Sequence, residues 1–323
     1  MAALAPPVAA VRTAVRQALR ETGGPVLVAC SGGADSLALA AATAFVAPRA
    51  GLAAGLVTVD HGLQSGSAER ASAVAAWARE AGLAPVEVAT VEVGGRSGGP
   101  EAAAREARYA ALLDAAARLG ASAILLGHTR DDQAETVLLA LARGAGPRGM
   151  AGMPPRREVD GVALLRPLLD VSREETRKAC AALGLSPWDD PHNADPAYAR
   201  ARVRSTALPA LVEALGAGVV DNLARTARLL AADAAALDEI AASALERARR
   251  PGDALDVTEL ERLPDGVRTR VLHAWARERG APPAALSHRH VAALDALVTA
   301  WRGQGAVHLP GGHLVARRGT LLR

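Results

Sequence analysis

The sequence predicts an α/β protein with a doubly wound, mostly parallel sheet, followed by a helical connector and a small α+β C-terminal domain. Three observations support this. Short apolar runs alternate with alanine-rich helical stretches through the first two-thirds of the chain, which is typical of a parallel sheet covered on both faces. A long helical stretch follows at 217–249. The chain then closes on alternating residues around Gly311 and Gly312, which is a hairpin signal.

The first part of the chain contains four predicted strands, each followed by a predicted helix. The strands are at 25–30, 54–60, 86–93 and 121–127. The helices are at 35–46, 67–81, 101–119 and 131–143. Because ligands of such sheets bind at the carboxyl ends of the strands, we expect the site at 30–36, 60–64 and 127–132.

The pattern changes after Pro167. We expect, in order, a helix at 172–183, a loop at 186–199, and a helix that opens near Ser205. Two further helices are predicted at 264–279 and 287–301. The expected parts are therefore a catalytic domain at 1–215, a connector at 216–250 and a C-terminal domain at 251–323.

Composition excludes several classes of protein. Half of the 323 residues are hydrophobic, so wholesale disorder is excluded. Cys30 and Cys180 are far apart with no CxxC pair, which disfavours a disulfide framework or a zinc site. No apolar run is long enough to span a membrane, and no signal peptide is recognisable at the start. We therefore expect a cytoplasmic protein with no membrane partner.

The positive charges are almost all arginine. Lys178 is the only lysine among 37 Lys and Arg residues, which face 34 Asp and Glu residues for a formal charge of +3. Compositional bias of the coding genome explains the choice of arginine. Because guanidinium groups bind phosphate bidentately, the placement of the arginines indicates whether a polyanion binds.

The first motif, SGGADS, joins a predicted strand to a predicted helix. Its glycines allow close backbone approach to an anion, and the helix N-terminus favours negative charge there. Walker and GxGxxG patterns are absent. The motif predicts a phosphate cradle made of Ser31, Gly32, Gly33, Ala34, Asp35 and Ser36, although Asp35 would also serve as an ordinary first-turn acid.

The second motif follows the fourth predicted strand. Asp132 and Glu135 lie three apart on the first turn of a helix, so their carboxylates share one face, and His128 precedes that turn. Such a set can hold Mg²⁺, accept a proton or bind a cationic amine. A helix start that favours acids and a loop histidine without a role are the simpler alternatives.

Two arginine sets complete the candidates. Arg105 and Arg108 share a helix face, where a solvated face with Glu101 paired to Arg105 is the default interpretation. We expect Arg200, Arg202 and Arg204 to lie in a loop, where they could spread along a phosphodiester backbone. An ordinary charged linker is the alternative for this second set.

These motifs resemble one family. SGGADS is the signature of the N-type ATP pyrophosphatase superfamily, with its adenine nucleotide alpha hydrolase-like fold. With VDHGLQ, EAAAREARYAAL, GHTRDDQAETVLLALARGAGPRGMAGM, RPLL and DDPHNADPAYARARVRSTALPAL, the chain resembles the tRNA(Ile)-lysidine synthases over about 24–215. Beyond 215 only the general plan is similar, and the chain looks like a short form of the family.

The resemblance implies a ligase that uses ATP and Mg²⁺ to attach free L-lysine to C2 of the wobble cytidine of tRNA(Ile) with a CAU anticodon, through an adenylated cytidine. It implies that Asp35 places Mg²⁺ and that Arg108 acts at the α-phosphate. His128, Asp132 and Glu135 would serve the lysine amine, in roles that the sequence does not separate. Arg200, Arg202 and Arg204 would contact tRNA, and a homodimer is left open.

Two alternatives remain. A tRNA thiolase of the same superfamily also adenylates a base oxygen, but sulfur transfer needs suitably placed cysteines, and Cys30 and Cys180 are isolated. A non-catalytic tRNA-binding protein could keep the nucleotide fold. The intact set of SGGADS, His128, Asp132 and Glu135 disfavours it.

Overall fold

The computed structural model describes residues 4–60, 62, 66–91, 100–190, 195–283 and 285–323. The chain forms two compact units, Met1–Leu229 and Leu230–Arg323. Parts of two motifs, at 61, 63–65 and 191–194, lie outside the described residues, as do 92 and 93 of the third predicted strand.

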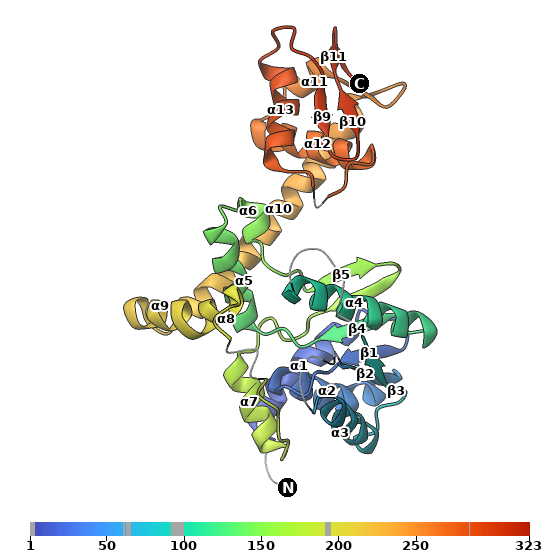
Figure 1. Cartoon of the computed structure of the whole chain (residues 1–323), viewed down its shortest axis with the longest axis vertical. Coiled ribbons are helices and arrows are strands. Elements are labelled where there is room, and N and C mark those ends of the chain that lie inside the picture. The colour runs from blue at the N-terminus through green and yellow to red at the C-terminus, as the bar shows by residue number, and fades with distance from the viewer. Residues whose placement is uncertain (1–3, 61, 63–65, 92–99, 191–194, 284) are drawn as a thin grey trace. The chain divides into compact units, whose positions relative to one another are not determined.

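Unit 1 is built on a six-stranded sheet in the order β3-β2-β1-β4-β6-β5 (Figure 1). The strands are β1 (Val26–Ala29), β2 (Ala54–Asp60), β3 (Val86–Thr90), β4 (Ala123–Leu126), β5 (Arg156–Val159) and β6 (Val162–Leu165). All neighbours pair in parallel except β5, which runs antiparallel to β6 at the sheet edge. The predicted doubly wound, mostly parallel sheet is confirmed.

Helices cover both faces of this sheet because side chains alternate along each strand. Val26 and Val28 of β1 belong to one apolar cluster, with residues of the first, second and seventh helices, whereas Leu27 belongs to another, with Leu112 of the fourth. The helices are α1 (Pro6–Leu19), α2 (Ala34–Val46), α3 (Ser67–Glu80), α4 (Pro100–Arg118), α5 (Arg130–Ala142), α6 (Pro147–Met150) and α7 (Arg173–Ala182), with a 3-10 turn at Pro48–Ala50.

The sequence prediction missed the β5–β6 hairpin. Its turn is formed by Asp160 and Gly161, which both have positive φ, at 50° and 79°. Asp-Gly between two short runs is a standard hairpin signal, so this element was detectable from the sequence. The hairpin extends the sheet beyond β4 and leaves β4 as an interior strand.

The expected loop around Arg200, Arg202 and Arg204 is wrong, because the segment is helical. It consists of α8 (Ala199–Arg202), a π-helical turn (Val203–Ala207) and α9 (Leu208–Leu215). Pro209 lacks an N–H and its ring crowds the carbonyl four residues earlier, which accounts for the irregular turn before α9.

The 30-residue helix α10 (Val219–Ala248) contains the boundary between the units. Unit 2 adds α11 (Val257–Glu261), α12 (Asp265–Glu278) and α13 (His288–Thr299). Its strands are β7 (Arg249–Arg250), β8 (Ala254–Asp256), β9 (Val307–Leu309), β10 (His313–Val315), β11 (Arg317–Arg318) and β12 (Leu321–Leu322). β9 and β10 form the predicted hairpin, and Trp275, Leu272 and Leu294 are fully buried in the core of the unit.

No single helix among the described residues is long and apolar enough to cross a membrane. One pair of helical stretches, Ala199–Leu215 and Val219–Ala248, passes by length and composition alone and is bent by 102°.

Candidate active site

Two of the predicted motifs meet where the strand order reverses, at the carboxyl ends of β1 and β4. Gly127, directly after β4, lies against the start of α2. A Cβ at Gly127 would lie 3.1 Å from both the backbone N and the Cα of Ser36, so any side chain here would crowd the cradle. Such a reversal point is where open α/β sheets bind their ligands.

The segment at 31–36 is shaped as an anion cradle. The Ser36 hydroxyl accepts a hydrogen bond from the Ser31 N–H at 3.2 Å and donates one to the Gly33 carbonyl at 3.0 Å, which fixes the loop. Gly32 has a φ of 85°, a conformation that favours glycine. Gly33 is the N-cap of α2 and offers no side chain to cap it, so the helix start is left to a ligand.

Asp35 sits in the first turn of α2, behind this cradle. Its carboxylate accepts a hydrogen bond from the Thr176 hydroxyl, and its Oδ2 lies 3.9 Å from Nε of Arg173. Burial, reinforced by the negative charge of Asp132, raises the pKa of Asp35 to about 6, against the opposing effects of Thr176 and the arginines. Ionised Asp35 would therefore gain from a nearby cation.

Mg²⁺ fits this residue, since the ion is often held by one or two carboxylates together with substrate phosphates. Asp35 borders the cradle and has an energetic reason to bind a cation. The described residues contain no group of three or more His, Cys, Asp or Glu side chains that could hold a metal unaided. Phosphate oxygens would thus supply the remaining ligands.

Asp132 and Glu135 lie together on the first turns of α5, as predicted, and three arginines surround them. Asp132 Oδ1 accepts from Arg173 and Arg204, each at 3.0 Å. Glu135, which is fully buried, accepts from Arg173 at 3.0 Å, Arg200 at 3.1 Å and Arg204 at 2.7 Å. We call Asp132, Glu135, Arg173, Arg200 and Arg204 the ion-pair cluster.

The ion-pair cluster is tightly bonded. The second oxygen of Asp132 accepts from the Thr129 N–H at 2.8 Å and the Thr129 hydroxyl at 3.0 Å, closing a capping box at the start of α5. Burial alone would raise the pKa of Asp132, but Arg173 and the Thr129 N–H outweigh it and hold the pKa below its usual range. Asp132 is therefore ionised, and together with Glu135 it orients the three guanidiniums.

His128 follows Gly127 at the same sheet edge. Its Nδ1 is buried and has no hydrogen-bond partner among the described residues. Burial lowers the pKa of His128 to about 3, Arg166, Arg105 and Arg200 lower it as well, and only Asp132 opposes them. The imidazole is thus neutral at physiological pH and lies in a positive environment.

Arg108 belongs to that environment. The side chain is half-buried on α4, and burial together with the charges of Arg105 and Arg200 lowers its pKa. Arg108 makes no hydrogen bond or ion pair with any described residue. Because the cations around His128 repel one another, this part of the site favours an anion, in keeping with the role expected of Arg108.

The three arginines at 200–204 separate into two groups. Arg200 and Arg204 are four apart on the helical segment and both bond Glu135. Arg202 lies on the other face, is exposed, and donates to the carbonyls of Pro196 at 2.6 Å and Ala197 at 3.0 Å. They therefore do not spread along one line, which corrects the arrangement expected of a loop.

Sequence reasoning overlooked Arg173 and Thr176. Both lie on α7, which comes after Asp35 and Asp132 in the chain, and their side chains reach these two carboxylates. A signal existed, because Arg173 is the first residue of a helix, where a positive charge opposes the helix dipole. An arginine at that position therefore suggests a side-chain partner, and here the guanidinium joins three carboxylates.

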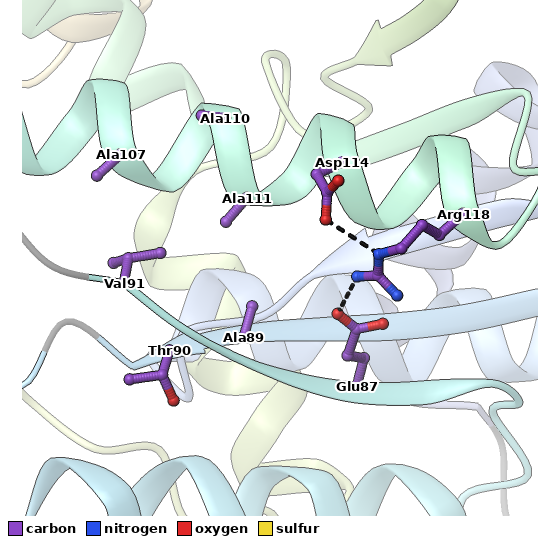
Figure 2. A pocket seen from close by; sticks show the side chains of 9 residues that line it. All are labelled: Glu87, Ala89, Thr90, Val91, Ala107, Ala110, Ala111, Asp114 and Arg118. Carbon is purple, nitrogen blue, oxygen red and sulfur yellow. Dashed lines mark hydrogen bonds and ion pairs between the residues drawn. The ribbon is translucent and has the colours of Figure 1, made fainter.

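The pocket drawn in Figure 2 lies elsewhere, between β3 and α4. It measures about 590 Å³ and contains none of the predicted site residues. Arg118 crosses one end of it and pairs with Glu87 at 2.6 Å and Asp114 at 3.0 Å. The positive charge of Arg118 is therefore paired with two carboxylates that line the same pocket.

Family models and the sequences of known proteins match nearly the whole chain. A PP-loop domain matches residues 9–211 and a TilS substrate binding domain matches residues 255–322. The tRNA(Ile)-lysidine synthase of Salinispora tropica is 74% identical over 98% of this chain and 96% of its own length. Those of Thermobifida fusca and Streptomyces coelicolor are 59% and 58% identical, over 97% and 95% of this chain and 95% and 86% of theirs.

Among solved structures, the U34-tRNA thiolase NcsA from Methanococcus maripaludis, with its [4Fe-4S] cluster, has a TM-score of 0.56 at 18% identity. The match covers 69% of this chain and 80% of that one. At this identity the likeness concerns the fold alone.

Proposed function

The chain belongs to the tRNA(Ile)-lysidine synthase family, and from this premise we propose that its site joins L-lysine to C2 of the wobble cytidine of a CAU-anticodon tRNA(Ile). ATP is the second substrate, and AMP and pyrophosphate are the products. The observation that carries the proposal is the close approach of Gly127 to Ser36, which supports a phosphate cradle at 31–36 beside the charged residues of α5.

In the first half-reaction, the C2 oxygen of the cytidine attacks the α-phosphorus and pyrophosphate leaves. The internal hydrogen bonds of Ser31 and Ser36 fix the loop at 31–36, and the backbone N–H groups at the start of α2 would hold the phosphates. Asp35 would hold Mg²⁺, which when bound neutralises phosphate charge. Arg108 is the cation proposed for the α-phosphate, because it has no described ion pair to give up.

In the second half-reaction, the lysine amine attacks C2 and AMP leaves. The amine must first lose a proton, and we propose that His128, Asp132 and Glu135 bind the amine or accept this proton. The low pKa of His128 means that the imidazole is unprotonated and can accept a hydrogen bond. Asp132 and Glu135 already bond three arginines, which supports a positioning role for them as well.

The tRNA is the macromolecular partner, and arginines are the groups proposed to hold it. Arg202 is the member of the 200–204 set whose guanidinium is exposed and makes no described ion pair. We propose that Arg202 contacts phosphate directly and that Arg200 and Arg204 act from within the ion-pair cluster. We propose that the residues at 251–323 form a tRNA-contacting domain. The proposed location is the cytoplasm, and a homodimer is compatible with the proposal.

The decisive experiment is lysine incorporation. Full-length protein, ATP, Mg²⁺ and labelled lysine are expected to label a CAU-anticodon tRNA(Ile) but not initiator or elongator tRNA(Met). No label on any of them, or equal label on all three, would contradict the proposal. Omission of ATP is the matched control, because the adenylated base is required before the amine can attack.

The thiolase alternative has no support from the site. Cys30 is buried and its pKa is raised by burial, while Cys180 is buried, bonds the Ala34 carbonyl at 3.3 Å and has a pKa of about 11, raised by burial and by Asp35. Raised pKa values leave both cysteines as thiols rather than nucleophilic thiolates. Sulfur transfer would need the opposite.

A further inference from the structure

One buried arginine of unit 1 has no carboxylate partner. Arg166 comes directly after β6, at the carboxyl edge of the sheet, and is 6% exposed. It makes no ion pair with any described residue. Arg268, the other buried arginine among the described residues, pairs with Asp265 and Asp295. Because a buried charge without a partner is unfavourable, we expect Arg166 to bind an anion that the chain itself does not supply.

The guanidinium of Arg166 is held in place by its neighbours. Its Nη1 donates to the Pro154 carbonyl at 2.8 Å, and its backbone N–H donates to the Pro155 carbonyl at 2.8 Å. The side-chain amide of Gln133, from α5, bonds the N–H of Met153 at 2.7 Å and its carbonyl at 2.9 Å, which fixes the segment before the prolines. The Nε of Arg166 is buried and has no hydrogen-bond partner among the described residues. A fixed guanidinium with an unused donor is suited to binding a ligand.

The strand order places Arg166 next to His128 and away from the phosphate cradle. β4 lies between β1 and β6, and His128 follows β4. Since neighbouring strands are about 4.8 Å apart, the end of β6 is about 10 Å from the end of β1, which leads into the cradle. Burial is the main cause of the lowered pKa of His128, and of the three arginines that add to it Arg166 has the largest effect. His128 Nδ1 is also buried without a described partner, so two such polar atoms belong to the ends of neighbouring strands.

The carboxylate of lysine is the substrate anion that fits this position. The proposed function assigns the phosphates of ATP to the cradle and to Arg108. A guanidinium that is 6% exposed can be reached by a slender, flexible ligand but not by the backbone of a tRNA. Lysine is such a ligand, and a carboxylate forms strong charge-assisted hydrogen bonds with arginine. The rest of the lysine would then extend toward the groups proposed for its amine, His128, Asp132 and Glu135.

We propose that Arg166 binds the α-carboxylate of the substrate lysine and so selects lysine over amines that lack this group. The selection has a physical basis. A diamine would leave the buried guanidinium unpaired, and a site built to bond a polar group rejects analogues that lack it. The inference rests on the proposed function, because it concerns lysine as the substrate, and it adds the residue that determines which amine is used.

The test compares L-lysine, L-lysinamide and cadaverine as amine substrates of full-length protein with ATP and the CAU-anticodon tRNA(Ile). Lysinamide keeps both amines but has a neutral amide in place of the carboxylate, and cadaverine lacks the group altogether. Wild type should prefer lysine over each by about 10- to 100-fold in kcat/KM, the effect of one charge-assisted contact. Arg166→Gln should raise the KM for lysine by a similar factor, remove most of the preference, and leave the KM for ATP within about twofold.

Two further variants separate this role from a structural one. Arg79→Gln is the matched control: it removes the same charge from an exposed position on α3 and should keep the preference for lysine. Arg166→Lys restores the charge without the planar fork and should regain part of the preference. The comparison of substrates in the wild type needs no variant, so it tests the inference even if a substitution at Arg166 impairs folding.

Three results would overturn the inference. They are equal use of lysine and lysinamide by the wild type, an unchanged preference for lysine in Arg166→Gln, and a raised KM for ATP with the KM for lysine unaffected. A wild type that transfers no amine at all would contradict the proposed function, whereas a wild type that transfers lysine without this selectivity would contradict the inference alone.

Discussion

Burial shifts the pKa values of two residues of the site in opposite directions. The pKa of Asp35 rises to about 6 and that of His128 falls to about 3, because a low-dielectric environment disfavours the charged form of each. The arginines around His128 add to its shift. An anion bound among them would oppose that effect, so the imidazole becomes a better proton acceptor once phosphate is present.

Asp35→Asn should show the first of these shifts as a pH dependence of stability. The folded pKa of about 6 lies above the ordinary value of 3.8, so protonated Asp35 contributes stability that is present below pH 3.8 and lost as pH rises through 6. The free energy of unfolding of the variant relative to wild type should therefore increase from pH 4 to pH 7.5, by at most about 3 kcal/mol. Urea unfolding without ATP measures it, and a difference that is constant with pH would contradict it.

Glu135→Gln should be strongly destabilising. The carboxylate is fully buried and bonds three guanidiniums. Its removal would leave Arg173 and Arg204 with Asp132, and Arg200 with the Thr136 hydroxyl and the Asp132 backbone carbonyl. Breaking a buried ion pair from one side costs about 3–5 kcal/mol. Glu158→Gln is the matched control, because Glu158 is half-exposed in a pair with Arg156, and such surface pairs contribute about 0–1 kcal/mol. Equal midpoints of urea unfolding for the two variants would argue against this.

At the scale of elements, the helical segment at 199–215 changes the meaning of its arginines. In a loop, Arg200, Arg202 and Arg204 would be equivalent. On a helix, residues four apart share a face, so Arg200 and Arg204 bond Glu135 whereas Arg202 stays exposed. The same three residues therefore divide between organisation of the site and availability to a partner.

This division gives a comparison of two variants. Arg204→Gln should lower the melting temperature, since it removes bonds to both Asp132 and Glu135, whereas Arg202→Gln should leave it nearly unchanged. Affinity for tRNA should fall in Arg202→Gln. Thermal unfolding and a filter-binding titration separate the effects, and a stable Arg204→Gln variant would show that the ion-pair cluster is not tightly coupled.

At the scale of the whole molecule, a formal charge of +3 is too small to attract a polyanion through net charge alone. Binding must depend on local groups of arginines. Affinity for tRNA should fall as salt rises, and Arg202→Gln should reduce the slope of log affinity against log salt by roughly 0.7–0.9, the value for one phosphate contact. Titrations between 50 and 200 mM salt test this, with Arg79→Gln as the charge control; an unchanged slope would place Arg202 outside the interface.

The amino-acid sequence by itself determined the alternation of strands and helices, the cradle at 31–36 and the neighbouring positions of Asp132 and Glu135. These depend on residues close together in the chain: apolar periodicity, glycines before a helix, and three-residue spacing. The Asp160-Gly161 hairpin belongs to the same class, although it was overlooked.

Only the tertiary structure decided which distant residues meet. Arg173 and Thr176 reach Asp35 across more than a hundred residues, and Trp188 reaches Gly32 in the same way. It also decided that Asp132 and Glu135 are already bonded to arginines, and that burial rather than residue type sets the pKa of Asp35 and His128. Burial and long-range contact follow from how the helices pack on the sheet, which local sequence patterns do not specify.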